Sequence, residues 1–412
     1  MMNSQGAATR ITVLGNFSGR NAGDNAILGN LVRDIAAAMP HVRFIVPTLN
    51  PAAVQWICRG YDVKPLGLMP WNGAMKILGL GTLRAMLQTD CVLVTDNILF
   101  DKSFFNPLFN YLSTIALFAP LARRRGIPIV LYNASVGPIA TARGAKALQR
   151  VLQGSPLALL RDRASVDLIT RKVHSRPELI VAADCALNTV PPPAAKIRAL
   201  AERLGIVADG RPKLALNVNS YLDAWKTKGD SVAPSSFVTE LAATFDELVR
   251  ECDAQPVFFV TQTMDIGITK SIRAAMTHGG TAPTAVVSAG CNYQELTGLL
   301  QNMDMLIAMR THALILATSV HTPTVNLNVY PKSAAYMETI GQGRWNLNVE
   351  DFSRQALTTL AKSAWSSRIA TRAELQRRVP PEKAKATSSA QRIRELLANR
   401  RAPYREVIDT AG

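Results

Sequence analysis

Three side chains near the carboxyl ends of two expected strands are suited to binding and protonating an anion. Arg310 and His312 follow an apolar run at 304–308 that we expect to form a buried strand, and Lys332 follows a second such run at 324–327. Open α/β sheets bind ligands at the carboxyl ends of their strands, and cationic side chains pair strongly with phosphate and carboxylate oxygens. We therefore expect Arg310, His312 and Lys332 to face one anion-binding crevice.

An apolar helix is expected directly after Arg310. Thr311 or His312 begins the apolar segment, which reaches Val320 before the chain enters the next strand. The N–H groups at a helix N-terminus attract phosphate or carboxylate, so Thr311 joins the predicted anion-binding residues. The same pattern is also typical of a helix cap beside a surface charge, and the residues alone leave both interpretations open.

A glycine-containing loop at 15–25 follows the first expected strand. Its glycines allow tight turns and a close approach of the backbone to a ligand, and Asn16, Gly23 and Asp24 are its candidate contact residues. Asp24 is also expected to cap a helix over 25–39. The loop lacks the spacing Gly-x-Gly-x-x-Gly, so a dinucleotide site is not indicated.

Further polar residues follow expected strands in the N-terminal half. Asp96, Gly137 and Arg161 each lie just after such a strand. Arg161 is a second candidate for anion binding, and the alternative is a solvated arginine paired with Asp162. Asp184, at another strand end, is expected to serve mainly in a turn or cap.

Two of these segments carry a family resemblance. The run MRTHALILATSVHTPTVNLNVYPK at 309–332 resembles the C-terminal signature of the polysaccharide pyruvyl transferase family, usually Arg-Leu-His-Ala, with Thr311 in place of the leucine. The loop around Gly23 and Asp24 is similar to the N-terminal signature of the same family. The resemblance covers roughly 11–340, and the C-terminal signature is its most specific part.

Other strand ends extend the resemblance, with one departure. The loop containing Gly137 and the segment containing Arg161 resemble the corresponding strand-end segments of the family. After the strand 91–95 the family commonly has a run of glycines, whereas this chain has Asp96 followed by Asn97 and bulky apolar residues. We expect these larger side chains to narrow the acceptor side of the cleft.

The resemblance implies transfer of a pyruvyl group from phosphoenolpyruvate to two hydroxyls of a sugar, which forms a ketal. It implies that His312 and Arg310 act in catalysis, and that Arg161, Lys332 and Thr311 bind the donor. Phosphoenolpyruvate is then a co-substrate, and neither a cofactor nor a metal is needed. The sequence leaves open which sugar is the acceptor and whether it is linked to a lipid.

Two further functions are compatible with the same residues. A glycosyltransferase with the B-type fold would use a nucleotide sugar as its donor, because a fold does not determine an activity. A protein that has lost catalysis and only binds glycans would retain the architecture, but the presence of Arg310, His312 and Lys332 argues against it.

Length and continuous apolar strands alternating with helices predict the architecture. A chain of 412 residues that is 48% hydrophobic suits two domains. We expect two Rossmann-like domains with parallel sheets, as in the B-type glycosyltransferases, at 1–190 and 213–350. A Pro-rich linker at 191–212 joins them, and a helical tail at 351–412 is expected to brace the N-terminal half.

The charge and the cysteines limit the class of partner. A net charge of +16 favours anionic partners, but the excess is dispersed and the aromatic content is only 6%, so nucleic acid is not expected. The five cysteines are scattered without a Cys-x-x-Cys motif, so neither a zinc site nor a disulfide framework is indicated. These features and an N-terminus without a signal peptide predict a cytoplasmic protein of undetermined oligomeric state.

An apolar segment at 107–122, followed by Arg123, Arg124 and Arg125, bears on membrane contact. It is shorter than the roughly 20 residues that a membrane span needs. A buried helix that leads into a strand at 127–132 is one interpretation. The other is an interfacial helix, attached peripherally to the anionic inner face of the membrane beside its arginines.

Overall fold

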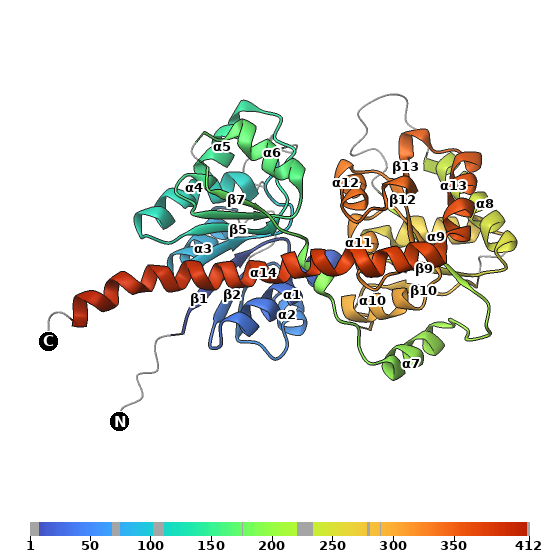
Figure 1. The fold of residues 1–412 in the computed structure, drawn as a ribbon, viewed down its shortest axis with the longest axis horizontal. Helices are drawn as coiled ribbons and strands as arrows, with labels where there is room; N and C mark the ends of the chain where they lie inside the picture. Colours follow the sequence, from blue (N-terminus) through green and yellow to red (C-terminus); the bar gives the residue numbers. More distant parts are fainter. Residues whose placement is uncertain are drawn as a thin grey trace. The chain divides into compact units, whose positions relative to one another are not determined.

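The chain forms two compact α/β units in the computed structural model, which describes residues 8–67, 75–101, 111–174, 176–220, 234–277, 281–288 and 290–409 (Figure 1). Unit 1 comprises Met1–Gly19, Ile27–Cys185 and Lys383–Gly412, and unit 2 comprises Arg20–Ala26 and Ala186–Glu382. Each unit contains one parallel sheet, and each is described separately below.

Unit 1 is built on a seven-stranded parallel sheet of order β3-β2-β1-β4-β5-β6-β7. The strands are β1 (Arg10–Leu14), β2 (Arg43–Thr48), β3 (Val63–Gly67), β4 (Cys91–Val94), β5 (Ile129–Ala134), β6 (Leu157–Leu160) and β7 (Glu178–Val181). The central strands β4, β5 and β6 are buried along their whole length, because helices cover both faces of a parallel sheet.

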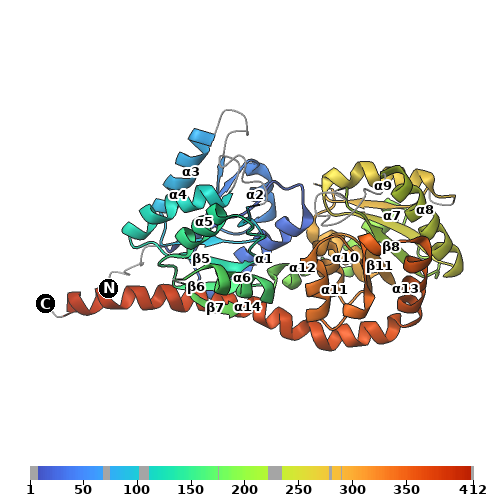
Figure 2. The ribbon, with the colours of Figure 1, turned by 90° about the horizontal axis from the view of Figure 1, so that it is seen from above.

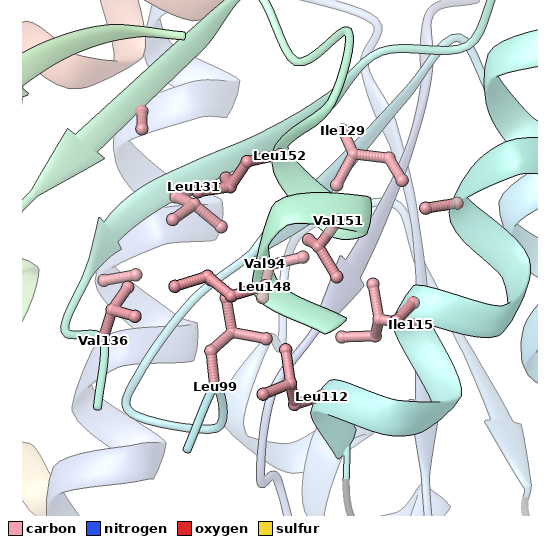
Figure 3. Packing of buried hydrophobic residues seen from close by; sticks show 14 of the residues in the cluster. Val94, Leu99, Leu112, Ile115, Ile129, Leu131, Val136, Leu148, Val151 and Leu152 are labelled. Carbon is pink, nitrogen blue, oxygen red and sulfur yellow. The ribbon is translucent and has the colours of Figure 1, made fainter. Parts of the chain in front are cut away.

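Helices α3 (Met75–Leu87), α4 (Tyr111–Arg124) and α5 (Ala142–Leu152) pack on one face of this sheet. Their apolar side chains interlock with alternate residues of the strands. Figure 3 shows Leu112 and Ile115 of α4 and Leu148 of α5 against Val94 and Leu131. Helices α1 (Ala22–Ala38), α2 (Pro51–Ile57) and α6 (Arg163–Lys172) complete the connections between strands.

The C-terminal part of helix α14 (Arg368–Asp409) also belongs to unit 1. Its buried residues recur at helical spacing, since Ala386, Ala390, Ile393 and Leu397 all face inward. Asn133 at the end of β5 donates to the carbonyl of Ala386 at 3.3 Å. The expectation that C-terminal helices brace the N-terminal half is therefore confirmed.

Unit 2 has a six-stranded parallel sheet of order β10-β9-β8-β11-β12-β13. The strands are β8 (Lys213–Asn217), β9 (Gln255–Val260), β10 (Thr284–Val286), β11 (Met305–Ala308), β12 (Thr324–Asn328) and β13 (Asn346–Asn348). Its helices are α7 (Ala194–Leu204), α8 (Pro234–Glu251), α9 (Ile266–Ala275), α10 (Tyr293–Gln301), α11 (Thr311–Ser319), α12 (Pro331–Thr339) and α13 (Arg354–Ser366). Figure 2 shows these helices layered around the sheet.

The predicted fold class, two parallel Rossmann-like sheets, is confirmed. The strands predicted at 304–308 and 324–327 are observed as β11 and β12 with nearly the same limits, whereas the short, partly exposed strands β3 and β13 were not predicted. The prediction that Asp24 caps the first long helix is wrong. That helix already begins at Ala22, and Asn21 accepts a hydrogen bond from the N–H of Gly23 at 2.8 Å.

Helix α4 is buried on one side, with Leu112, Ile115 and Phe118 in the unit 1 core, and the strand after it runs from Ile129 to Ala134. Residues 107–110 of the apolar segment lie outside the described residues. Among the helices that the structure describes, none is both long and apolar enough to cross a membrane.

Candidate functional site

The strand order of unit 2 reverses between β8 and β11, and open α/β sheets bind ligands at the carboxyl ends of the strands at such a point. Asn217 and Asn219 come from the end of β8, and Arg310 follows β11. Asp265 lies after β9, the other neighbour of β8. Polar side chains from three adjacent strands therefore meet at the place where α/β sheets bind ligands.

Arg310 forms a two-point ion pair with Asp265. Its Nε and Nη2 lie 2.8 and 2.7 Å from the two carboxylate oxygens of Asp265, a fully buried residue. Ser220 adds hydrogen bonds from its N–H and hydroxyl, both at 2.9 Å, to the same carboxylate. The guanidinium is only 14% exposed, so Arg310 is not the surface charge of the alternative interpretation. Its Nη1 makes no hydrogen bond within the part of the chain that the structure describes.

His312 is the second residue of α11 and packs against Gly23. A Cβ atom added at Gly23 would lie 2.1 Å from Cγ and 2.2 Å from Nδ1 of the imidazole. No residue other than glycine fits there unless the imidazole moves. The segment that carries Gly23 is held on unit 2 by backbone hydrogen bonds from Ala22 to Thr261, at 2.8 Å, and from Thr263 to Arg20, at 3.0 Å.

Helix α12 begins beside α11, since β11 and β12 are neighbours in the sheet. The hydroxyls of Thr311 and Ser333, in the first turns of the two helices, are 2.7 Å apart and buried. Lys332 precedes Ser333, and its ammonium lies 5.7 Å from the centre of the Tyr330 ring. The Tyr330 hydroxyl in turn accepts a hydrogen bond from Asn219 at 2.7 Å.

The arrangement combines two adjacent helix N-termini, each of which carries partial positive charge and N–H groups, with two cationic side chains and an imidazole. Such a site is suited to an anion with several oxygens beside an atom that gains or loses a proton. Thr311 directs its hydroxyl to Ser333, so any contact of Thr311 with a ligand falls to its backbone.

The carboxyl edge of unit 1 contains a second buried arginine with a different environment. Arg161 lies 2.5 Å from a carboxylate oxygen of Asp184 and 4.0 Å from one of Asp96. Burial disfavours the charged guanidinium, but the carboxylates of Asp184 and Asp96 outweigh it and raise the pKa of Arg161 above its ordinary value. Arg161 is thus surrounded by negative charge.

The alternative interpretation, in which a solvated Arg161 pairs with Asp162, is wrong. Asp162 instead accepts a hydrogen bond from the N–H of Ser165 at 2.7 Å, as the cap of α6. Asp184 was expected mainly in a turn or cap, and its ion pair with Arg161 was not anticipated.

The remaining predicted residues occupy distinct positions. Asn16 is exposed on the loop after β1, and Asp24 is buried in the first turn of α1. Asp96 adopts a left-handed backbone with φ of 62°, directly after β4. Gly137 has φ of 104°, and its N–H donates to the carbonyl of Leu99 at 2.8 Å, so it shapes the loop after β5.

The structure brings Arg310, Thr311, His312, Lys332 and Gly23 together in unit 2, whereas Arg161, Asp96, Asn16 and Gly137 belong to unit 1. Sequence reasoning missed several polar residues of unit 2. These are the buried Asn217, Asn219, Asp265 and Ser333 and the partly buried Tyr330. The segment Asn217-Val218-Asn219-Ser220 stands at the end of an apolar run. This position alone would have marked its two asparagines as candidates.

Within the described residues, no group of three or more His, Cys, Asp or Glu side chains is arranged to hold a metal ion.

The sequence matches one protein family. The profile described as polysaccharide pyruvyl transferase matches residues 21–329, which include both the segment of Gly23 and the segment from Arg310 to the end of β12. No curated protein matches the sequence.

Solved structures with the same architecture cover nearly the whole chain. They include the UDP-GlcNAc 2-epimerase of Neisseria meningitidis bound to UDP-GlcNAc, with 11% identity and a TM-score of 0.62 over 95% of this chain and 100% of that one. A putative UDP-N-acetylglucosamine 2-epimerase from Listeria monocytogenes has 11% identity and a TM-score of 0.63, covering 97% and 98%. Anabaena HepE in complex with UDP and glucose has 13% identity and a TM-score of 0.60, covering 95% and 99%. The chain therefore has the fold of the B-type glycosyltransferases and these epimerases.

Proposed function

The chain belongs to the polysaccharide pyruvyl transferase family, and on this premise we propose that it transfers pyruvyl from phosphoenolpyruvate to two hydroxyls of a sugar. The product is a pyruvate ketal on a polysaccharide or glycolipid precursor. The observation that carries the proposal is the pair of adjacent helix N-termini that carry Arg310, His312 and Lys332 at the carboxyl edge of the unit 2 sheet.

Phosphoenolpyruvate suits this edge because it carries a phosphate and a carboxylate on one small carbon frame. Lys332 and the N–H groups of α11 and α12 supply charge-assisted hydrogen bonds to such oxygens. Asp265 holds Arg310 in a fixed orientation, and Nη1 is the nitrogen that contacts the ligand. A fixed guanidinium loses little freedom on binding, which favours affinity and orientation.

The charge balance favours unit 2 over unit 1 for the donor. In unit 2 Arg310 pairs with the carboxylate of Asp265 and Lys332 adds a second positive charge, whereas in unit 1 Arg161 lies near two carboxylates. A trianionic donor is repelled by the second arrangement. We therefore propose that Arg161 organises unit 1 and does not bind the phosphate directly.

The chemistry requires proton transfer at carbon. In the proposed mechanism His312 donates a proton to the methylene carbon of phosphoenolpyruvate, and positive charge develops at the neighbouring carbon that carries the phosphate. One sugar hydroxyl adds to this carbon, the carbon–oxygen bond to phosphate breaks, and the second hydroxyl adds. One hydroxyl proton balances the proton gained by the methylene carbon, and the other leaves with phosphate. A positioned imidazole contributes typically 10²–10⁴-fold to such a step.

Unit 1 is proposed to recognise the sugar. Asp96, Asn16 and the loop of Gly137 lie after neighbouring strands at its carboxyl edge, and carboxylate and amide groups are suited to sugar hydroxyls. Asp96 is 12% exposed at its side chain.

The competing function is transfer from a nucleotide sugar, since solved structures of the same fold hold UDP or UDP-GlcNAc. Purified protein is incubated with phosphoenolpyruvate or with a panel of nucleotide sugars, in each case with a pool of glycan and lipid-linked acceptors. We expect phosphate release and ketal products with phosphoenolpyruvate alone. Products formed only with a nucleotide sugar would replace the proposal, and no donor-dependent product would favour a binding protein.

A further inference from the structure

Helices α3, α4 and α5 form a continuous layer on one face of unit 1, and their outward side chains do not resemble an ordinary solvated surface (Figure 2). Leu117 and Leu121 of α4 are 61% and 39% exposed, one helical turn apart, although the opposite side of α4 already fills the core. Leu80 of α3, the helix packed against α4, is 64% exposed. Exposed leucines gathered on adjacent helices of one surface indicate contact with an apolar partner.

The charges on the same layer are of one sign. Helices α3, α4 and α5 contain no Asp or Glu at all. Their exposed cations, together with the residue that follows α4, are Arg84, Arg123, Arg124, Arg125, Arg143, Lys146 and Arg150. Helix α6, by contrast, mixes both signs, and its Arg163 pairs with Asp167. An unmixed basic layer favours an anionic partner.

The exposed leucines and arginines lie on the same side of α4. Leu117 and Leu121 are followed one turn later by Arg124 and Arg125, so one outward stripe changes from apolar to basic. Leu80 and Arg84 repeat this order on α3. Interfacial helices have this distribution, because apolar side chains enter the acyl boundary while arginines remain among the headgroups.

A pocket adjoins the basic end of α4. It has a volume of about 380 Å³ and is lined by Arg10, Arg125 and Arg400 together with Asp90. Three guanidiniums around one hollow are suited to a phosphate headgroup, because arginine forms two parallel hydrogen bonds to phosphate oxygens.

We propose that the layer formed by α3, α4 and the start and end of α5 is a docking surface for an anionic lipid bilayer, with Leu80, Leu117 and Leu121 inserted at the interface. The contact is peripheral, because no described helix is able to span a membrane. It does not depend on the proposed pyruvyl transfer, since none of these residues belongs to the carboxyl edges of the two sheets.

Co-sedimentation of the full chain with vesicles tests the surface. One set of vesicles is phosphatidylcholine alone, and the other contains phosphatidylglycerol as well. We expect binding to the anionic set only, weakened when salt screens the attraction. Arg124→Glu with Arg125→Glu lowers the partition coefficient at least about 25-fold, since each basic residue near such a surface contributes about fivefold. Arg123 is left intact because it donates to the carbonyl of Gln153.

Two further variants locate the contact. Leu117→Ser with Leu121→Ser lowers partitioning at least about tenfold, because apolar insertion is lost while the net charge is unchanged. The control, Arg171→Glu with Lys172→Glu on α6, has the same charge change at another exposed surface and binds like the parent. Thermal unfolding confirms that each variant is folded.

Several results would overturn the proposal. Equal loss in the α4 and α6 charge variants would mean that only net charge matters. Unchanged partitioning of the leucine variant would show that the surface binds polyanions in general. Binding of DNA with the same strength would show the same. A lipid-free dimer that the leucine variant dissociates would show that a second copy covers the face.

Discussion

Each unit places an arginine directly after a strand and pairs it with an aspartate that follows another strand of the same sheet, yet the two pairs differ in what surrounds them. Arg161 of unit 1 lies between Asp184 and Asp96, with a side chain only 7% exposed. Arg310 of unit 2 faces Asp265 alone and is 14% exposed, at the start of a helix. The same pair of residue types thus produces a negative environment in one unit and a positive one in the other.

The difference shows that the same kind of ion pair can serve two different purposes. A buried pair flanked by a second carboxylate links strand ends and offers no attraction to an anion. A pair placed where two helices begin orients its guanidinium and leaves the positive helix ends dominant. We infer that unit 1 retains its arginine for architecture and unit 2 for ligand binding.

The largest expected effect is at His312. His312→Gln keeps hydrogen-bonding capacity but cannot exchange protons near neutral pH, so turnover at saturating phosphoenolpyruvate should fall about 10²–10⁴-fold. Donor affinity and melting temperature should change little. His174→Gln in unit 1, at an exposed position, is the control and should be fully active. A folded His312 variant with near-parental turnover would remove the imidazole from the mechanism.

A second prediction concerns Gly23, whose effect acts through His312. Gly23→Ala introduces a Cβ at 2.1 Å from Cγ of His312, so the imidazole must move. A displacement of about 1 Å costs on the order of 10²-fold in rate. The turnover should drop while the donor affinity is retained. Gly267→Ala in α9, where an added Cβ has nothing within 4 Å, is the matched control. Equal turnover in both variants would show that the contact with Gly23 does not position the imidazole.

The third prediction contrasts the two edges directly. Lys332→Met should weaken binding of phosphoenolpyruvate about ten- to a hundred-fold, because one charge-assisted contact is lost. Arg161→Met should leave donor affinity unchanged but lower the free energy of unfolding by about 3–5 kcal/mol, since Asp184 then stays buried without its partner. Calorimetric titration and chemical denaturation measure both. Loss of donor affinity in the Arg161 variant alone would mean that the donor binds to unit 1 instead.

The smallest effect concerns the cysteines, because one thiol of unit 2 is less buried than the others. Burial raises the pKa of Cys58 and Cys91 in unit 1 to about 12, and that of Cys291 in unit 2 likewise to about 12. Cys252 of unit 2 is only half-buried. At pH 8 a thiol reagent should therefore label Cys252 first in the native protein and the others only after unfolding.

These raised pKa values also determine how stability varies with pH. The thiols favour the folded state fully below their ordinary pKa near 9, and this contribution is lost as the pH rises toward 12. Denaturation at pH 8 and pH 10 should show lower stability at the higher value. Rapid labelling of Cys58 or Cys91 in folded protein at pH 8 would contradict their burial.

The fold was largely predictable from the sequence because its signals are local. Apolar strands such as those at 304–308 and 324–327 stand out between helices, and the short, partly exposed strands β3 and β13 were missed because packing, not composition, makes them strands. The first helix was placed too late because Asn21 and Asp24 are equally good caps by residue type, and the side chain of Asn21 is the one that caps the helix.

The candidate site was only partly predictable, since its partners are distant in sequence. Arg310 and Asp265 are 45 residues apart, and nothing local in either segment indicates their pairing. The close approach of Gly23 to His312 depends on the docking of a short segment onto unit 2, which no periodicity reveals. Their positions at strand ends identified Arg310 and Lys332 as candidates. Only the structure shows the burial that restrains Arg310.

The most direct test of the account is calorimetric titration of the full chain with phosphoenolpyruvate, and in parallel with UDP and UDP-GlcNAc. The account predicts saturable binding of phosphoenolpyruvate that Lys332→Met weakens about ten- to a hundred-fold and Arg161→Met leaves unchanged. Binding of the uridine nucleotides with no binding of phosphoenolpyruvate would contradict the assignment of the unit 2 edge as a phosphoenolpyruvate site.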